Sequence, residues 1–136
     1  MDQVLARDPI ADRQADLAAR LEAVLASAHD YAELRLLSLL RAGVVRLPAE
    51  DVADAERLLG VTGQSVRARV GLPDDAGAAE VLAAGRRQIA RWRRRAEHPL
   101  SDRAVKDAAA VLVRTCEGIV VDGTPSSDRP AGAHDD

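Results

Sequence analysis

The side chains that most often perform chemistry are sparse in this chain of 136 residues: one cysteine, Cys116, and three histidines, His29, His98 and His134. Cys116 lies on the apolar face of an expected helix, where Arg114 is the nearest cation. A thiol in such a place behaves as a small hydrophobic group. The histidines follow no metal-ligand spacing. The sequence therefore predicts no catalytic residue and no metal site.

The sequence also lacks a phosphate-binding motif. The loop GxxxxGK followed by Ser or Thr does not occur, and the single lysine, Lys106, lies inside an expected helix. The paired acids Glu50-Asp51 and Asp74-Asp75 stand at expected helix starts, where a negative charge stabilises the positive end of the helix dipole. We therefore expect no cofactor and no enzymatic activity in this chain.

An arginine cluster surrounds the single tryptophan: Arg91, Arg93, Arg94 and Arg95 flank Trp92. Clustered arginines can bind phosphates of nucleic acid or of lipid headgroups. The formal net charge of −3 disfavours a nucleic-acid partner. The pattern favours an arginine face that is solvated or paired within the fold, with a partner surface or anionic lipid as the other readings. A lone tryptophan on an apolar helical face is typical of a core residue.

The elements that must position these residues are helices. The chain is 47% hydrophobic but only 1% aromatic, a composition dominated by Ala, Leu and Val that suits close helix packing. Apolar positions recur at helical spacing in five stretches. Within the first of them, Asp30 leaves open one bent helix or two. The stretches cover residues 14–42, 48–59, 64–70, 76–97 and 101–121.

Helix ends are marked by Gly43, by Gly60 and by the His98-Pro99 pair, with Thr62 and Ser101 as expected caps. We expect an all-α fold, a small antiparallel bundle of four or five helices with a disordered C-terminal tail. The expected organisation is a loosely ordered lead-in over residues 1–13, a helical domain over 14–122 and a disordered acidic tail over 123–136.

The first residues carry no apolar signal-peptide core, and no run approaches the roughly 20 apolar residues that span a bilayer. One cysteine allows no disulfide within the chain, which suits a reducing compartment. A cytoplasmic location is therefore expected.

Four segments carry a more specific signal: Tyr31–Leu40, Ala68–Leu72, Trp92–Leu100 and Val113–Glu117. In order and spacing, from about Leu21 to Val121, they resemble the C-terminal neck and trunk region of the isoniazid-inducible, dynamin-like GTPases of bacteria. Members of that family couple GTP hydrolysis to membrane remodelling and are linked to envelope-drug tolerance. None of the family's catalytic residues can be carried over, since its nucleotide-binding motifs lie in a domain that has no counterpart here.

The resemblance implies a non-catalytic helical module that associates with a GTPase-domain-bearing partner in membrane remodelling or envelope maintenance. A split or truncated remnant of such a GTPase, and a small Arg-rich DNA-binding or regulatory protein, are the alternatives. Other candidate partners are an anionic membrane surface, which would place the chain at the inner face of the membrane, and a second copy of the chain. The apolar faces Leu36–Leu40 and Val105–Ile119 are the expected partner strips. The full candidate partner or core surface comprises Leu36, Leu37, Leu40, Trp92, Arg93, Arg94, Arg95, Leu112 and Ile119.

Overall fold

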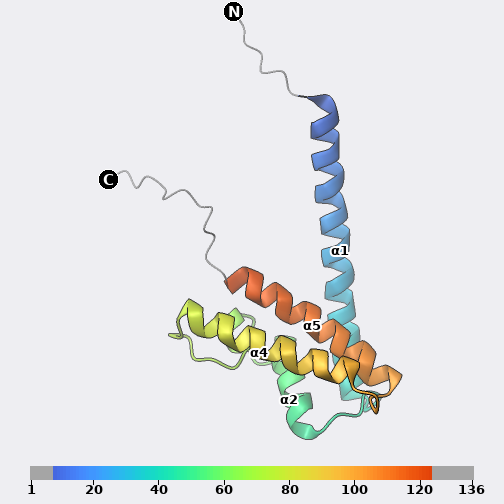
Figure 1. Cartoon of the computed structure of the whole chain (residues 1–136), viewed down its shortest axis with the longest axis vertical. Coiled ribbons are helices and arrows are strands. Elements are labelled where there is room, and N and C mark those ends of the chain that lie inside the picture. The colour runs from blue at the N-terminus through green and yellow to red at the C-terminus, as the bar shows by residue number, and fades with distance from the viewer. Residues whose placement is uncertain (1–7, 124–136) are drawn as a thin grey trace, which may run out of the picture. The chain divides into compact units, whose positions relative to one another are not determined.

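The computed structural model describes residues 8–123, and within them every regular element is an α-helix. The helices are α1 (Pro9–Arg41), α2 (Ala49–Leu58), α3 (Val66–Arg69), α4 (Ala78–Glu97) and α5 (Arg103–Gly123) (Figure 1). The expected all-α class with five helices is confirmed. The expected acidic tail lies outside the described residues apart from Gly123, which ends α5.

The chain divides into two units, residues 1–32 and 33–136. The described part of the first unit is the N-terminal stretch of α1. The second unit holds the end of α1 and all the other helices.

Helix α1 is continuous from Pro9 to Arg41, without a restart at Asp30. It begins five residues before the expected start at Gln14, because Asp8 and Pro9 together form a good helix start. The Asp8 carboxylate accepts a hydrogen bond from the backbone N–H of Ile10 at 3.0 Å, and proline suits the first helical position. Every residue from Asp8 to Ala28 is exposed.

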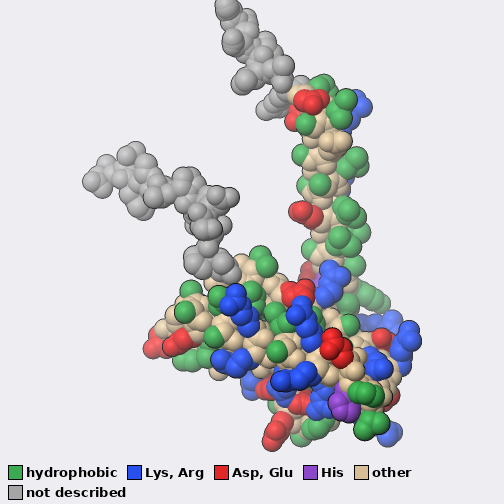
Figure 2. All heavy atoms as spheres, in the orientation of Figure 1, with side chains coloured by type: hydrophobic (Ala, Val, Ile, Leu, Met, Phe, Trp, Pro, Cys, Tyr) green, Lys and Arg blue, Asp and Glu red, His purple; other side chains and the backbone are tan. Residues whose placement is uncertain are grey.

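Large apolar side chains nevertheless occupy the exposed first unit, and Figure 2 shows hydrophobic side chains along α1 with charged ones between them. We call six of them the α1 stripe. Their exposed fractions run from 49% to 69%. The α1 stripe consists of Ile10, Leu17, Leu21, Val24, Leu25 and Tyr31.

In the second unit, α4 and α5 lie side by side and run in opposite directions (Figure 1). The side chain of Val120 on α5 packs onto α4 at Gly85, where an added Cβ would lie 2.7 Å from Cγ2 of Val120. Glycine costs a helix stability relative to alanine, so its place in the middle of α4 is explained by this close approach. Helix α5 is capped by Asp102, whose carboxylate accepts from the N–H of Val105 at 2.8 Å, and not by Ser101 as expected.

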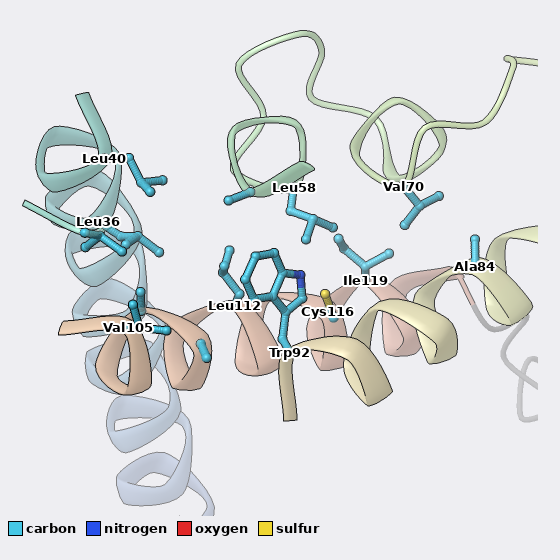
Figure 3. Close-up of a cluster of buried hydrophobic side chains, with 14 residues drawn as sticks. Leu36, Leu40, Leu58, Val70, Ala84, Trp92, Val105, Leu112, Cys116 and Ile119 are labelled. Atoms are coloured by element: carbon cyan, nitrogen blue, oxygen red, sulfur yellow. The ribbon is translucent and has the colours of Figure 1, made fainter. Parts of the chain in front are cut away.

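The core of the second unit lies between α2, α4 and α5, with side chains from the end of α1 at one side (Figure 3). Trp92 is fully buried and is packed among aliphatic side chains, with Leu112 and Cys116 beside it in Figure 3. Its indole N–H donates to Oε1 of Gln88 at 3.2 Å. Gly43, with φ +73°, ends α1 by turning the chain in the left-handed region.

Candidate functional site: an acid–arginine network and a basic hollow

The most concentrated electrostatic feature is a network between α2 and α4. The carboxylate of Asp51, whose side chain is 8% exposed, accepts hydrogen bonds from the guanidinium groups of Arg91 and Arg95. Asp54 accepts from Arg91 as well, and from Arg57 at 2.9 Å. Arg91 and Arg95 are four residues apart and so lie on one side of α4, facing the acids of the first turns of α2.

The network changes the acidity of its central cation. Burial on its own lowers the pKa of Arg91. The hydrogen bonds and negative charges of Asp54 and Asp51 outweigh burial, so the pKa of Arg91 is raised above its ordinary value. Arg91 therefore stays charged, and the network is a permanent ionic link between the two helices.

A second, partly buried link joins the end of α1 to α3 and α5. Oε2 of Glu33 accepts from the hydroxyl of Thr115 at 2.7 Å and from Nη2 of Arg69 at 3.4 Å. Nε of Arg69 also donates to the carbonyl oxygen of Leu58 at 2.8 Å. Sequence reasoning missed Glu33 and Thr115. A threonine on the buried face of α5, between Leu112 and Ile119, was the one available signal for a buried polar partner.

Beside the first network lies a hollow of about 230 Å³ lined by Arg91, Arg94, Arg95 and His98. A second hollow of about 190 Å³ shares Arg95 and His98 with it and extends to Arg46 and to the turn before α5. Leu100, at this turn, is 89% exposed. We call the two hollows together the basic hollow.

The arginines of the basic hollow differ in whether a carboxylate pairs with them. Arg91 and Arg95 are held by Asp51 and Asp54. Within residues 8–123, Arg46 and Arg94 form no ion pair, and both are exposed. An arginine without a carboxylate partner can donate two parallel hydrogen bonds to a carboxylate or phosphate. The basic hollow is therefore able to bind an anionic group.

The residues of the expected partner or core surface are partly buried in the core and partly exposed in the structure. Leu36, Leu40, Trp92, Leu112 and Ile119 are buried together in the core of the second unit (Figure 3). Leu37 is half-buried. The three arginines differ from one another: Arg93 is exposed and pairs with Glu117 at 3.2 Å, Arg94 is exposed in the basic hollow, and Arg95 is half-buried against Asp51.

Of the residues first considered for chemistry, the structure describes Cys116, His29 and His98. Cys116 is fully buried, and burial raises the pKa of its thiol to about 12, although the charge of Arg69 opposes this shift. Such a thiol carries very little thiolate at neutral pH. No group of three or more potential metal ligands occurs within residues 8–123. His134 lies outside the described residues.

Fold and site thus define a small helical module with an internal ionic network and a basic surface. None of its described helices is both long and apolar enough to cross a membrane. No protein-family model matches the chain, and no solved structure matches it.

The curated relatives are more informative. The chain is 38% identical over 104 residues to the isoniazid-induced protein IniC of Mycobacterium tuberculosis, in both strain CDC 1551 / Oshkosh and strain H37Rv. The match takes in 76% of this chain and 21% of each relative. The chain therefore spans about a fifth of the length of the curated relatives it matches, and it is related to a part of IniC.

Proposed function

We propose that this chain is a non-catalytic helical module that associates with a GTPase-domain-bearing chain of the dynamin-like kind, in membrane remodelling or envelope maintenance. The similarity to IniC over 104 residues carries the proposal, because at that identity the helical architecture of the matched segment is shared. The sequence has no phosphate-binding loop, so nucleotide binding has to come from the partner. The module itself supplies a docking surface.

The basic hollow is the surface best suited to docking on a protein. The ionic network with Asp51 and Asp54 fixes Arg91 and Arg95, so the hollow is preorganised. Arg46 and Arg94 supply the charge for acidic side chains of the partner. Leu100, which is almost fully exposed, supplies an apolar anchor beside them.

Affinity purification of the tagged chain from its own cells, followed by mass spectrometry, tests this proposal. We expect to recover a chain that contains GxxxxGK followed by Ser or Thr. Arg94→Glu should abolish the recovery. Arg86→Glu makes the same charge change at another exposed position of α4 and should leave the recovery intact. A well-folded wild-type chain that captures no such protein would favour the reading as a gene remnant.

An anionic membrane surface is the second candidate partner, favoured by the exposed Leu100, which lines the hollow together with Arg46 and Arg95. Basic residues at a membrane surface each contribute about 1 kcal/mol with anionic lipid. Co-sedimentation should then occur with vesicles containing phosphatidylserine and not with vesicles of phosphatidylcholine alone. Equal sedimentation with both would exclude this partner.

The DNA-binding alternative has less support. Carboxylates of the same fold occupy Arg91, Arg93 and Arg95, which leaves few arginines of the cluster for phosphates. Binding driven by phosphates weakens steeply between low and physiological salt, so an electrophoretic mobility shift with duplex DNA is measured first at low salt. No shift at low salt would exclude the DNA-binding reading.

A further inference from the structure

The α1 stripe holds six of the eleven exposed large hydrophobic side chains of the described residues. A helix in a soluble protein gains most of its stability by packing an apolar face against another element. The described part of the first unit has an apolar face and nothing within it to cover that face, since every residue from Asp8 to Ala28 is exposed. The sequence of the stripe itself indicates what covers it.

The spacing of the stripe is that of a coiled-coil seam. Positions 10, 14, 17, 21, 24, 28 and 31 follow one another at alternating intervals of four and three residues, which is the heptad pattern of two helices that pack along their length. All the charged residues of this stretch stand at other positions. They are Asp12, Arg13, Asp16, Arg20, Glu22 and Asp30.

We propose that the α1 stripe pairs with the α1 stripe of a second copy of this chain, in antiparallel orientation. With Leu21 opposite Val24 of the second copy, the adjoining layer brings Leu17 opposite Ala28. At the edge of the seam, Leu25 then meets Ala18. Large side chains thus face small ones in the adjoining layer and at the edge, which is the condition for filling an interface without gaps.

The same register also places the polar members of the seam together. Gln14 lies opposite Tyr31 of the second copy, so the tyrosine hydroxyl and the glutamine amide can form a hydrogen bond at each end of the seam. Pairing thus gives the Gln14 amide of the seam a hydrogen-bond partner. Since the arrangement is two-fold symmetric, each of these contacts occurs twice.

Parallel pairing fits these residues less well. Identical positions would then face each other, so Ala28 would meet Ala28 and leave a gap, while Gln14 would meet Gln14. The two helix dipoles would also be aligned, whereas in the antiparallel pair they oppose each other. The size pattern therefore selects the antiparallel orientation.

The area available is adequate for a stable pair. Burying a large aliphatic side chain removes on the order of 100 Å² of apolar surface from water. Five such side chains from each of two copies, Ile10 lying beyond the last paired layer, give on the order of 1,000 Å², which reaches the roughly 1,000 Å² expected of a specific interface. The seam from Gln14 to Tyr31 is about 26 Å long at 1.5 Å per residue.

Light scattering on the purified full-length chain tests self-association. We expect twice the mass of one chain for the wild type at roughly 100 µM, and the mass of one chain for Leu21→Glu. Ala26→Glu introduces the same charge at an exposed position of α1 off the stripe and should remain dimeric. Fluorescence of the buried Trp92 shows whether each variant keeps the second unit folded. A wild-type mass of one chain would overturn the proposal.

Cysteine cross-linking tests the orientation. A mixture of Leu17→Cys and Ala28→Cys chains, with tags of different size, should form the mixed disulfide on oxidation. Neither variant alone should form its own, because equivalent positions lie on the order of 16 Å apart along the antiparallel seam. The native Cys116 is buried and adds no background. A disulfide of Leu17→Cys with itself would show a parallel pair and contradict the register.

This inference does not rest on the proposed function. It concerns the purified chain alone and the first unit, whereas partner capture was assigned to the basic hollow of the second unit. Leu21→Glu is therefore expected to remain able to capture a partner, and Arg94→Glu is expected to remain dimeric, so failure of one proposal is distinguishable from failure of the other.

Discussion

Asp51 shows how one nearly buried side chain can fix two helices. Its carboxylate is shared by Arg91 and Arg95, which are themselves 28% and 38% exposed. Removing one partner of a buried pair is costly because the remaining charge has lost its compensation. The cost here is lowered because both arginines retain some contact with water.

Asp51→Asn should therefore lower the free energy of unfolding by about 2 kcal/mol, measured by urea denaturation. Arg103→Gln is the control, because Arg103 and Asp107 are 90% and 71% exposed and pair at 3.7 Å. That variant should change stability by less than about 0.5 kcal/mol. Equal effects of the two substitutions would show that the network contributes no more than a surface pair.

The thiol of Cys116 makes stability depend on alkaline pH. Its pKa is raised by burial from 9.0 to about 12. The unfolded thiol loses its proton above pH 9 while the folded thiol keeps it, so the unfolded state is favoured as pH rises. We expect the contribution of this thiol to stability to be constant below pH 9 and to fall between pH 9 and pH 12, and Cys116→Ala to remove this part of the fall. The measurement is urea denaturation of both proteins across that range.

The residues of the site were only partly predictable. An arginine face paired within the fold follows from composition and net charge. The identity of each partner does not, because Asp51 is 40 and 44 positions away from Arg91 and Arg95 in the chain and only the packing of α2 on α4 brings them together. Near Asp51 the sequence offers a helix start, which already explains an acid there, so nothing local marked it as a partner for arginine.

At the scale of the elements, α4 and α5 depend on the absence of a side chain at one position. Gly85→Ala should destabilise the chain by about 1–3 kcal/mol, because the new Cβ would lie 2.7 Å from Cγ2 of Val120 and either that side chain or the helices would have to shift. Gly118→Ala is the matched control. Gly118 lies within α5, and a Cβ there meets nothing within 4 Å.

Gly118→Ala should raise stability by up to about 1 kcal/mol, since alanine is the better helix former. Thermal denaturation of both variants checks that the two substitutions change stability in opposite directions. A stabilising Gly85→Ala would mean that α4 and α5 do not approach as closely as described.

The number and approximate positions of the helices were predictable, because apolar positions recur at helical spacing and because glycine and proline mark the helix ends. The boundaries depended on local hydrogen bonds that compete with one another. Asp102, rather than Ser101, caps α5, and the two adjacent residues are both good caps. Asp8 and Pro9 start α1 in a polar stretch where apolar periodicity gives no signal.

For the molecule as a whole, the division into two units predicts that the second unit is stable without the first. Its core draws only on residues from Leu36 onward. Deleting residues 1–28 should leave the thermal midpoint of the core within about 2 °C of that of the wild type. The midpoint is measured by the fluorescence of Trp92. A fall of about 10 °C or more would show that the first unit stabilises the core and would contradict the division.

Trp92 is the only aromatic ring in a core built from aliphatic side chains, because the chain has no phenylalanine and Tyr31 is exposed on the α1 stripe. Ring-current shifts in the core therefore have a single source. In a methyl-labelled sample, the resonances displaced furthest upfield belong to the neighbours of one indole, among them Leu112 (Figure 3). The core thus carries its own distance reference for NMR assignment, which an aromatic-rich protein of this size does not offer.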